Sequence, residues 1–489
     1  MTDTTPIQRV GPDRMSRRTF LSWLAGIAAV ALVVRVVFVL VRQSSVVLVT
    51  GDAYWYHFQA KLVADGRGFL HPFDYFVDGV VAPGADHPPG FVLILALLDV
   101  LGISTPQGQR LVMCVVGTVT VLLVGLLGRR LAGDRVALVA AAFAALYPNF
   151  WINDGMLMVE TVYMLASVVA LLGCYAYLAR PRWGTLVLTS AAIVVAGMHR
   201  PEALALFALM VLPMVWGRRA LSVPLRIGHL AAAAGIVVVA FAPWAAYNQA
   251  RFDAFVPIST GAGQTLVAAN CDLTYSGQAL GFYDTKCLLA PQIEEPTTTN
   301  RSERDRQYNA IARAYMAEHV GELPRVVAAR IGRLWHVFRP GQSLGLDGFI
   351  EGRAGGPPGS SFWPVREALW SYFVLAPTSL VGLWILHRRG RRIYPLLAQP
   401  VLATVVAATT FGITRYRAGA EITIVVAAAV AAVAAFDWLL GRRLATDSVG
   451  AADGDPPDGG RGDEWAEQQP DAGTGDVPRA GDEPVGAGT

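Results

Sequence analysis

Residues 20–58 read FLSWLAGIAAVALVVRVVFVLVRQSSVVLVTGDAYWYHF, and this stretch decides the class of fold. Its apolar part extends to about Val41, which is long enough for an α-helix to cross the hydrocarbon core of a bilayer. A polar segment follows, and it contains one acid, Asp52, two residues before a run of aromatic residues. The sequence therefore predicts a membrane-spanning helix that ends near a carboxylate at the membrane surface.

The composition of the whole chain indicates several such helices. Of its 489 residues, 54% are hydrophobic and only 16% are charged, and the mean hydropathy is +0.42. Soluble domains carry about 25% charged residues, so an ordinary soluble enzyme is excluded. We predict an all-α polytopic membrane protein. Its expected spans are 20–41, 109–127, 135–149, 155–178, 184–199, 201–216, 226–247, 366–386, 393–411 and 419–440.

Arginine clusters predict the orientation, because cytoplasmic loops of membrane proteins are enriched in basic residues. With about ten spans, both termini are cytoplasmic and all clusters lie on that side. The clusters are Arg129, Arg130 and Arg135; Arg180 and Arg182; Arg218, Arg219 and Arg226; Arg388, Arg389, Arg391 and Arg392; Arg442 and Arg443. The apolar segment 89–101 is too short for a span, so we expect a juxtamembrane or re-entrant helix on the outer side.

The expected organisation has five parts. Ser16-Arg17-Arg18-Thr19-Phe20-Leu21 resembles a twin-arginine export signal, but the following run lacks a clear cleavage site, so we predict a retained first helix. The acidic, Gly- and Pro-rich tail is expected to be disordered. The parts are a cytoplasmic segment 1–19, a transmembrane module 20–250 with an outer loop 42–108, an extracytoplasmic loop 251–365, C-terminal helices 366–441 and a cytoplasmic tail 442–489.

Two cysteines support an extracytoplasmic loop. Cys271 and Cys287 lie 16 residues apart in the same expected outer loop, and an oxidising exterior favours a disulfide between them. Two free thiols are the alternative. No third and fourth ligand occurs at a spacing suited to a metal, so we predict no metal site.

The first outer loop carries the main candidate for chemistry. Asp52 could accept a proton from an acceptor hydroxyl. Its alternatives are a solvated loop acid or an N-cap for a helix over 53–65. The neighbouring Tyr54, Trp55 and Phe58 could equally be interface anchors of the kind that membrane proteins place at the bilayer surface.

Four more ionisable residues are expected at the outer ends of spans: Glu160, Arg200, Arg415 and Arg417. Such residues at membrane depth are functional candidates by default. Arginine suits a phosphate, because its guanidinium donates two parallel hydrogen bonds. The alternatives are an ion pair between Arg200 and Glu202 and an Arg417 that reaches out to the membrane surface.

Together these motifs resemble the GT-C membrane glycosyltransferases, and in particular the bacterial branch related to protein O-mannosyltransferases and aminoarabinose transferases. The motifs are Asp52 after the first helix, then Tyr56, Ala60 and Gly66, then His87-Pro88-Pro89-Gly90, Leu146-Tyr147-Pro148, Arg200-Pro201-Glu202 and Arg415-Tyr416-Arg417. One departure stands out. Many relatives have an Asp-Glu pair, whereas Ala53 follows Asp52, so a second acid is lost or moved to Asp86.

The resemblance implies that a sugar, hexose or pentose, is transferred with inversion from a polyprenyl-phosphate carrier to an acceptor hydroxyl on the outer face. Asp52 would be the catalytic base. The implied substrate-binding residues are Tyr56, His57, Asp86, His87, Glu160, Arg200, Arg415 and Arg417. The implied partners are the lipid-linked donor, the bilayer and a cell-envelope glycan, lipid or protein acceptor, without a cofactor.

A transporter and a non-catalytic scaffold are the alternatives to a glycosyltransferase. A lipid or solute transporter would place ionisable residues near the membrane midplane and would have paired broken helices. The predicted spans are instead rich in Ala, Val and Leu, with Arg35 as the main exception. A non-catalytic scaffold does not explain Asp52 and Arg200 on one side. No nucleotide-binding loop or nucleic-acid module is present in the sequence.

Overall fold

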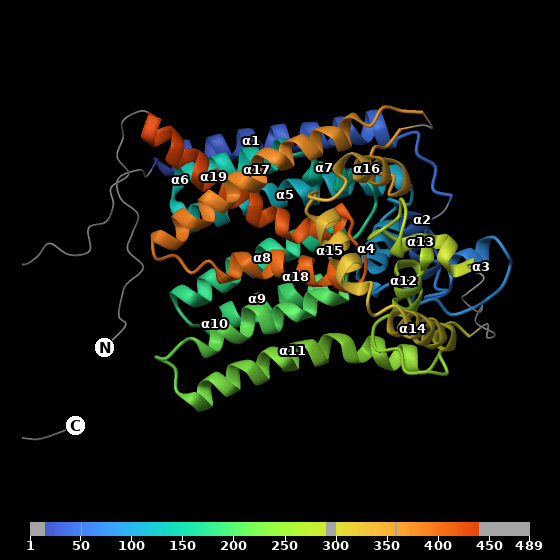
Figure 1. Cartoon of the computed structure of the whole chain (residues 1–489). Coiled ribbons are helices and arrows are strands. Elements are labelled where there is room, and N and C mark those ends of the chain that lie inside the picture. Colours follow the sequence, from blue (N-terminus) through green and yellow to red (C-terminus); the bar gives the residue numbers. More distant parts are fainter. Residues whose placement is uncertain (1–14, 50, 290–299, 357–358, 440–489) are drawn as a thin grey trace, which may run out of the picture. The chain divides into compact units, whose positions relative to one another are not determined.

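The computed structural model describes residues 15–49, 51–289, 300–356 and 359–439. Within these ranges the chain is helical, with one isolated bridge between Leu70 and Pro83 and no strand, which confirms the predicted all-α polytopic class (Figure 1). The described residues pack as one unit. The predicted disordered tail and most of the N-terminal segment lie outside the described residues.

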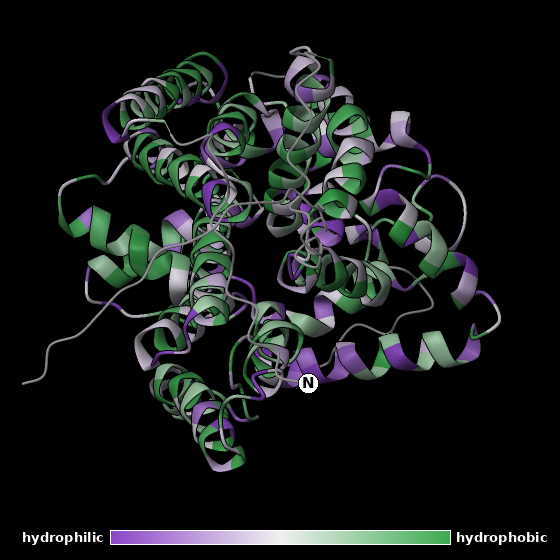
Figure 2. Ribbon diagram, turned by 90° about the vertical axis from the view of Figure 1, so that its left-hand side faces the viewer, coloured by the Kyte–Doolittle hydropathy of each residue, from purple (hydrophilic) through white to green (hydrophobic). Residues whose placement is uncertain are grey.

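Six helical segments in the described ranges are long and apolar enough to cross a membrane. They are α1 with its π-helical end (Arg17–Gln43), α5 (Pro106–Ala132), α8 (Glu160–Ala179), α11 (Val223–Gln249), α17 (Trp363–Arg388) and η6 with α19 (Thr414–Leu439). A bent pair, α6 (Asp134–Leu146) and α7 (Pro148–Gly155), would make a seventh span. Figure 2 shows how hydrophobic residues dominate the long helices.

Each predicted span matches a helix, but three helices are shorter than a typical span. These are α9 (Trp183–Gly197), the segment Pro201–Trp216 and α18 (Tyr394–Thr409). A count of ten spans requires that these three also cross the membrane. The predicted short outer helix is α4 (Pro89–Val100), which packs against α2 (Gly51–Ala64).

Prolines explain where two predicted spans are interrupted. The span expected at 135–149 breaks at Tyr147, because Pro148 disfavours the helical conformation in the residue before it. Tyr147 is extended, with ψ 118°, and the two halves meet at 49°. The segment Pro201–Trp216 is likewise divided, into a 3₁₀ turn, a π turn and the short helix α10 (Leu212–Trp216), with prolines at 201 and 213.

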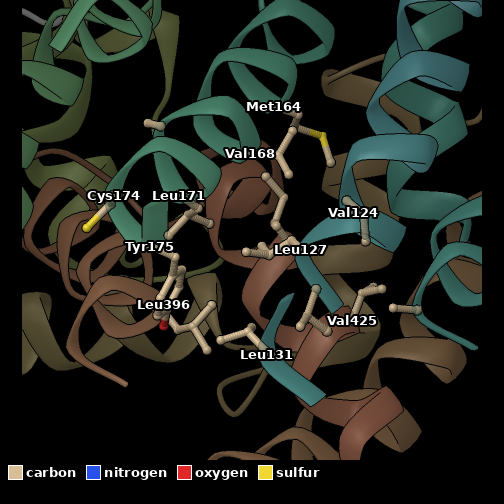
Figure 3. Close-up of a cluster of buried hydrophobic side chains, with 14 of the residues drawn as sticks. Val124, Leu127, Leu131, Met164, Val168, Leu171, Cys174, Tyr175, Leu396 and Val425 are labelled. Carbon is tan, nitrogen blue, oxygen red and sulfur yellow. The ribbon is translucent and has the colours of Figure 1, made fainter. Parts of the chain in front are cut away.

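The core combines large apolar side chains with small residues that let helices approach closely. Leu127, Met164 and Val168 from α5 and α8 interdigitate there with Leu396 of α18 and Val425 of α19 (Figure 3). Between α17 and α19, a Cβ atom added at Gly382 would collide with the carbonyl oxygen of Ala427. Such close backbone contacts are typical of helices packed inside a membrane, where dispersion replaces the hydrophobic effect.

Arg35, the charged residue within the first span, is paired inside the protein. Arg35 is fully buried, and its Nε atom lies 2.7 Å from Oδ2 of Asp154 on α7. The Thr161 hydroxyl donates to Oδ1 of the same carboxylate at 2.8 Å. Gly117 leaves the space that this carboxylate fills. The pair joins three helices, as expected for a charge kept out of lipid.

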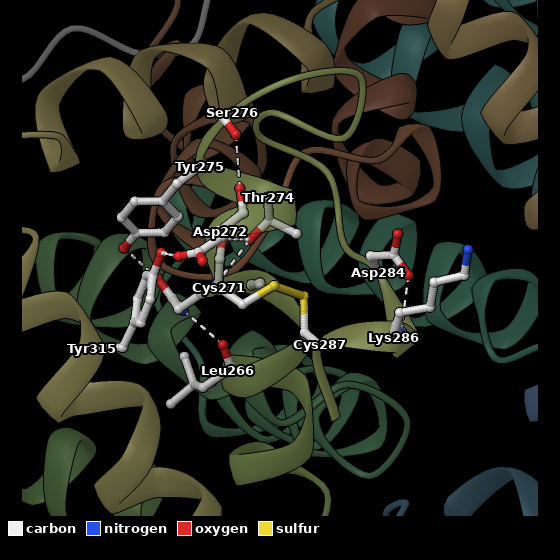
Figure 4. The surroundings of a disulfide bond; sticks show 12 residues. Leu266, Cys271, Asp272, Thr274, Tyr275, Ser276, Asp284, Lys286, Cys287 and Tyr315 are labelled. Atoms are coloured by element: carbon white, nitrogen blue, oxygen red, sulfur yellow. Dashed lines mark hydrogen bonds between the residues drawn. A yellow bond between two sulfur atoms is a disulfide. The ribbon is translucent and has the colours of Figure 1, made fainter. Parts of the chain in front are cut away.

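The polar helices gather at one end of the long helices. They are α2, α3 (Pro72–Phe76), α12 (Ala262–Ala269), α13 (Asp272–Tyr275), α14 (Arg301–Glu318), α15 (Leu323–Leu334) and α16 (Pro340–Gly345), on the right in Figure 1. A disulfide joins Cys271 to Cys287, with a Cα–Cα distance of 5.8 Å (Figure 4). It closes the segment between α13 and the 3₁₀ turn Thr285–Leu289.

Candidate active site

The site is centred on Asp52, in the first turn of α2. Gly51 precedes it with φ +78°, a left-handed conformation that favours glycine and lets the chain turn sharply into the helix. Asp52 thus lies inside the helix, and the alternative that it caps a helix over 53–65 is wrong. Its Oδ2 accepts from Nη1 of Arg415 at 2.9 Å, and its Oδ1 lies 3.7 Å from Nε2 of His87.

Arg415 lies between two carboxylates. It belongs to the 3₁₀ turn η6 (Thr414–Arg417) before α19. Its Nε lies 2.8 Å from Oε2 of Glu351, while the Tyr283 hydroxyl donates to Oε1 of Glu351 at 2.6 Å. Residues from four distant parts of the chain therefore meet around one guanidinium.

Arg200 forms a second ion-pair centre next to the first. It donates through Nη2 to Glu160, at the start of α8, and through Nη1 to Glu202 at 3.1 Å. Its guanidinium also lies 4.8 Å from the ring centroid of Tyr416, the neighbour of Arg415 in sequence. The ion pair with Glu202 therefore exists, but it is only one of two.

The electrostatics of the first loop keep Asp52 ionised. Burial alone would raise the pKa of Asp52, but the charge of Arg415, with help from His87, lowers it below its usual value. Burial raises the pKa of Tyr56 well above normal, and the charges of Asp52 and Glu160 raise it further. Tyr56, one turn after Asp52, therefore keeps its hydroxyl proton.

Two predicted site residues do not join this cluster. His57 faces α5, where its Nδ1 lies 2.8 Å from Oε1 of Gln109. Arg417 is fully buried, pairs with Glu421 at 2.7 Å and lies 3.8 Å from the ring centroid of Tyr372. A 3₁₀ turn has three residues per turn, so Arg415 and Arg417 point in different directions. The expectation that Arg417 reaches the membrane surface is wrong.

Asp86 lies in a neighbouring network. Its Oδ1 accepts from the Thr260 hydroxyl at 2.9 Å, and its Oδ2 lies 3.7 Å from Nη1 of Arg301 and 3.7 Å from Nε2 of His71. Burial by itself would raise the pKa of Asp86, but the hydrogen bond from the His71 side chain and the charge of Arg301 lower it below its usual value. Asp86 therefore links the first loop to α14 instead of facing Asp52.

The interface-anchor interpretation is wrong for Tyr54 and Trp55. Both are buried, at 7% and 3% exposure, because the first loop folds back over α2. Tyr54 stacks on Phe73 with centroids 4.4 Å apart, and Trp55 packs edge-on against His71 at 4.5 Å. These aromatic side chains pack inside the protein, next to the site residues of α2.

Sequence reasoning missed Glu351 and Tyr283. Glu351 is flanked by Gly348, Gly352 and further glycines, and an isolated acid in such a stretch carries no motif. Tyr283 lies in the segment closed by the disulfide, which also contains Tyr275, and no motif in that segment marks one tyrosine over the other. The described residues contain no group of three or more His, Cys, Asp or Glu suited to a metal ion.

The chain was compared with family models, with curated proteins and with solved structures. Residues 86–247 match the family model of dolichyl-phosphate-mannose-protein mannosyltransferases, which covers about a third of the chain. No curated protein matches the chain. The site residues His87, Glu160 and Arg200 fall within the matched segment, whereas Asp52 and Arg415 fall outside it.

Among solved structures, the chain is similar to the oligosaccharyltransferase of Archaeoglobus fulgidus tethered to an acceptor peptide with an NVT sequon. The identity is 14%, the TM-score is 0.51, and the match covers 90% of this chain and 52% of that chain. The apo form of that protein gives 16% identity, a TM-score of 0.50 and 90% and 53% coverage. The chain thus spans about half the length of these proteins. ArnT from Cupriavidus metallidurans bound to undecaprenyl phosphate is also similar, at 16% identity, a TM-score of 0.40 and 85% and 79% coverage.

The resemblance to the GT-C membrane glycosyltransferases is confirmed over residues 86–247, which match the mannosyltransferase family model, and the fold is similar to that of the oligosaccharyltransferase. At these identities the structural likeness concerns the fold, and the chemistry must come from the site itself.

Proposed function

We propose that the chain is an integral-membrane glycosyltransferase that moves a hexose or pentose from a polyprenyl-phosphate carrier to an acceptor hydroxyl. The observation that carries the proposal is the pairing of an ionised, partly exposed carboxylate with arginine. Asp52 is 32% exposed at its side chain and is held by Arg415, which is 15% exposed. The proposed base and the proposed phosphate-binding cation are thus in direct contact, and both remain partly exposed.

In the proposed step the acceptor oxygen attacks the anomeric carbon while the bond from that carbon to the phosphate oxygen breaks. The acceptor proton passes to Oδ1 of Asp52, the oxygen that Arg415 does not occupy. The electron pair of the broken bond leaves with the carrier phosphate. A single displacement of this kind inverts the anomeric centre.

Arg200 and Arg415 are the proposed ligands of the departing phosphate. Arg200 Nε is buried without a hydrogen-bond partner among the described residues, so this donor can serve a ligand. Hydrogen bonds from a charged donor to a phosphate are about twice as strong as neutral ones. Glu160 and Glu202 orient the Arg200 guanidinium through Nη2 and Nη1, and they thereby set the direction of the Nε–H donor.

Polyprenyl phosphate is the proposed donor class for two reasons. The matched family is named for a dolichyl-phosphate sugar, and ArnT is described with undecaprenyl phosphate. The site also lies at the end of long apolar helices, where a lipid carrier can deliver its headgroup. Candidate acceptors are a cell-envelope glycan, lipid or protein.

We also propose that this end of the helices is extracytoplasmic and that both termini are cytoplasmic. The loops that join α5 to α6, α8 to α9, α10 to α11 and α17 to α18 lie at the opposite end (Figure 1). Those loops carry four of the five arginine clusters, and basic loops remain in the cytoplasm.

A transporter is less well supported. Its expected ionisable pair inside the membrane exists as Arg35 and Asp154, but each partner satisfies the other and both are buried. Most of the other ion pairs lie at the end of the helices that carries Asp52.

The test incubates the purified protein and envelope membranes with a panel of radiolabelled polyprenyl-phosphate sugars. Purified wild-type protein should transfer label from at least one donor to an envelope acceptor fraction, and the product should have the opposite anomeric configuration. Activity with nucleotide sugars alone, or transport without transfer, would overturn the proposal.

A further inference from the structure

We propose that Glu351 is a positioning residue that fixes the Arg415 guanidinium beside Asp52, and that Tyr283 in turn holds Glu351. The inference rests on the proposed function, because it concerns the same site. It adds two residues that act through Arg415 instead of touching the substrate.

The backbone around Glu351 is anchored on both sides. The segment begins with the π turn Leu346–Ile350, where Asp347 accepts a hydrogen bond from the Thr414 hydroxyl. Two residues after Glu351, Arg353 donates to Oδ1 of Asn153 at 2.8 Å and to Oδ1 of Asn149 at 3.1 Å on α7. The Glu351 side chain therefore extends from a fixed base, and π turns recur at functional sites.

Both oxygens of Glu351 are used. Its side chain is 4% exposed, and it meets Arg415 Nε at 2.8 Å and the Tyr283 hydroxyl at 2.6 Å. A buried carboxylate is stable only with such partners. Asp52 is 32% exposed at its side chain and Glu351 only 4%, so Asp52 is the carboxylate that a substrate can reach and Glu351 is the one enclosed by protein.

The two carboxylates together determine the plane of the guanidinium. Asp52 accepts a hydrogen bond from Nη1, and Glu351 lies in ion-pair contact with Nε at 2.8 Å without an aligned hydrogen bond, so rotation of the planar group would separate the guanidinium from one of the two carboxylates. With only one carboxylate, the long arginine side chain would sample other rotamers. Tyr283 completes the support, since its ring lies 4.8 Å from Phe411 and Phe411 lies 5.2 Å from Tyr416, next to Arg415.

The first test is a double-mutant cycle on transfer rate. Glu351→Gln removes the charge that pairs with Arg415, so it should lower the rate about 10- to 100-fold in wild-type background, the range expected for a charge-assisted contact. In an Arg415→Ala background the same change should cost at most about twofold, because coupled residues are non-additive. Equal losses in both backgrounds would show that Glu351 acts elsewhere and would overturn the proposal.

Tyr283→Phe removes only the hydroxyl, so it should lower the rate less, by about three- to tenfold. Tyr315→Phe is the matched control. The Tyr315 hydroxyl also donates to a carboxylate oxygen at 2.6 Å, on Asp272, away from Arg415 (Figure 4). The control should stay within about twofold of wild type. If both variants lose the same activity, the effect belongs to the loop as a whole and the role of Tyr283 is refuted.

The second test needs no sugar donor. Phenylglyoxal modifies free guanidinium groups, and mass spectrometry reads the extent at each arginine. Glu351→Gln should raise the reactivity of Arg415 several-fold over wild type. Arg301, held by both oxygens of Asp74 at 2.7 Å, is the internal reference and should not change.

The two tests separate the two ideas. If no donor supports transfer but Arg415 becomes reactive in Glu351→Gln, the proposed function fails and the positioning role stands. If Arg415 reactivity is unchanged, the positioning role is overturned, even where the variant loses transfer activity.

Discussion

The substitution Asp52→Asn isolates the proposed base. The amide oxygen of asparagine can still accept from Nη1 of Arg415, which is 2.9 Å from the native carboxylate, and Arg415 keeps its contact with Glu351. The geometry of the arginine is therefore retained. The change removes a proton acceptor and one negative charge, and nothing else in the cluster.

The expected magnitude follows from those retained contacts. General-base catalysis contributes about 10²- to 10⁴-fold, so the transfer rate should fall by at least 100-fold. Donor binding should stay equal or become tighter, because Arg200 and Arg415 remain and a negative charge next to them is lost. The effect should therefore appear in kcat rather than in KM for the donor.

The assay is initial-rate transfer from the donor identified in the panel, combined with a thermal-shift titration with the polyprenyl phosphate alone. Asp78→Asn is the matched control, since Asp78 is an exposed acid of the same loop. The reasoning would be refuted by an Asp52→Asn rate within tenfold of wild type. An equal loss in donor affinity would refute it as well, because it would show a binding role instead of a base.

Four further predictions follow from other contacts. Replacing Arg415 by methionine should move the acid limb of the pH–rate profile to higher pH. Asp52 then keeps the burial that raises its pKa and loses the arginine charge that lowers it. If the acid limb does not move, it reports the titration of another group. Cys271→Ser with Cys287→Ser should lower the stability of the outer helices by about 3 kcal/mol, seen as earlier proteolysis of that region, whereas unchanged proteolysis would contradict a stabilising bridge. Gly382→Val should destabilise the protein in a thermal-unfolding assay far more than Gly235→Val, since a Cβ at Gly382 meets backbone and a Cβ at Gly235 meets open space. Cysteines placed at the exposed Ser222 and Ser276 should react with impermeant maleimide from opposite sides of the membrane, and labelling from one side would end the proposed topology.

The class of fold was readable from the sequence because a bilayer imposes a local rule. A helix must satisfy its own backbone hydrogen bonds and present apolar side chains over about 20 residues, and both properties are visible in a linear stretch. Helix ends followed local chemistry too: Thr105 precedes α5 and its hydroxyl oxygen accepts from the backbone N–H of Gly108, and Gly133 follows the helix with φ +96°. The break before Pro148 is equally local, yet periodicity and hydropathy alone extended that span through it.

Part of the site was also readable, because ionisable residues at the ends of apolar spans are rare enough to be noticed. Asp52, Glu160, Arg200 and Arg415 were singled out on that ground and His87 by its motif, and the structure gathers these residues around two arginines. Their roles remain proposals.

Only the tertiary structure decided which of these residues meet. Arg415 and Arg417 look equivalent in the sequence, yet one turn of 3₁₀ helix points the first at Asp52 and the second at Glu421. Glu351 lies 299 positions after Asp52 in an unremarkable stretch, and it reaches Arg415 because Asp347 and Arg353 fasten its segment to η6 and α7. Contacts between distant segments depend on how the helices pack, and side-chain packing at long range leaves no periodic mark on a single sequence.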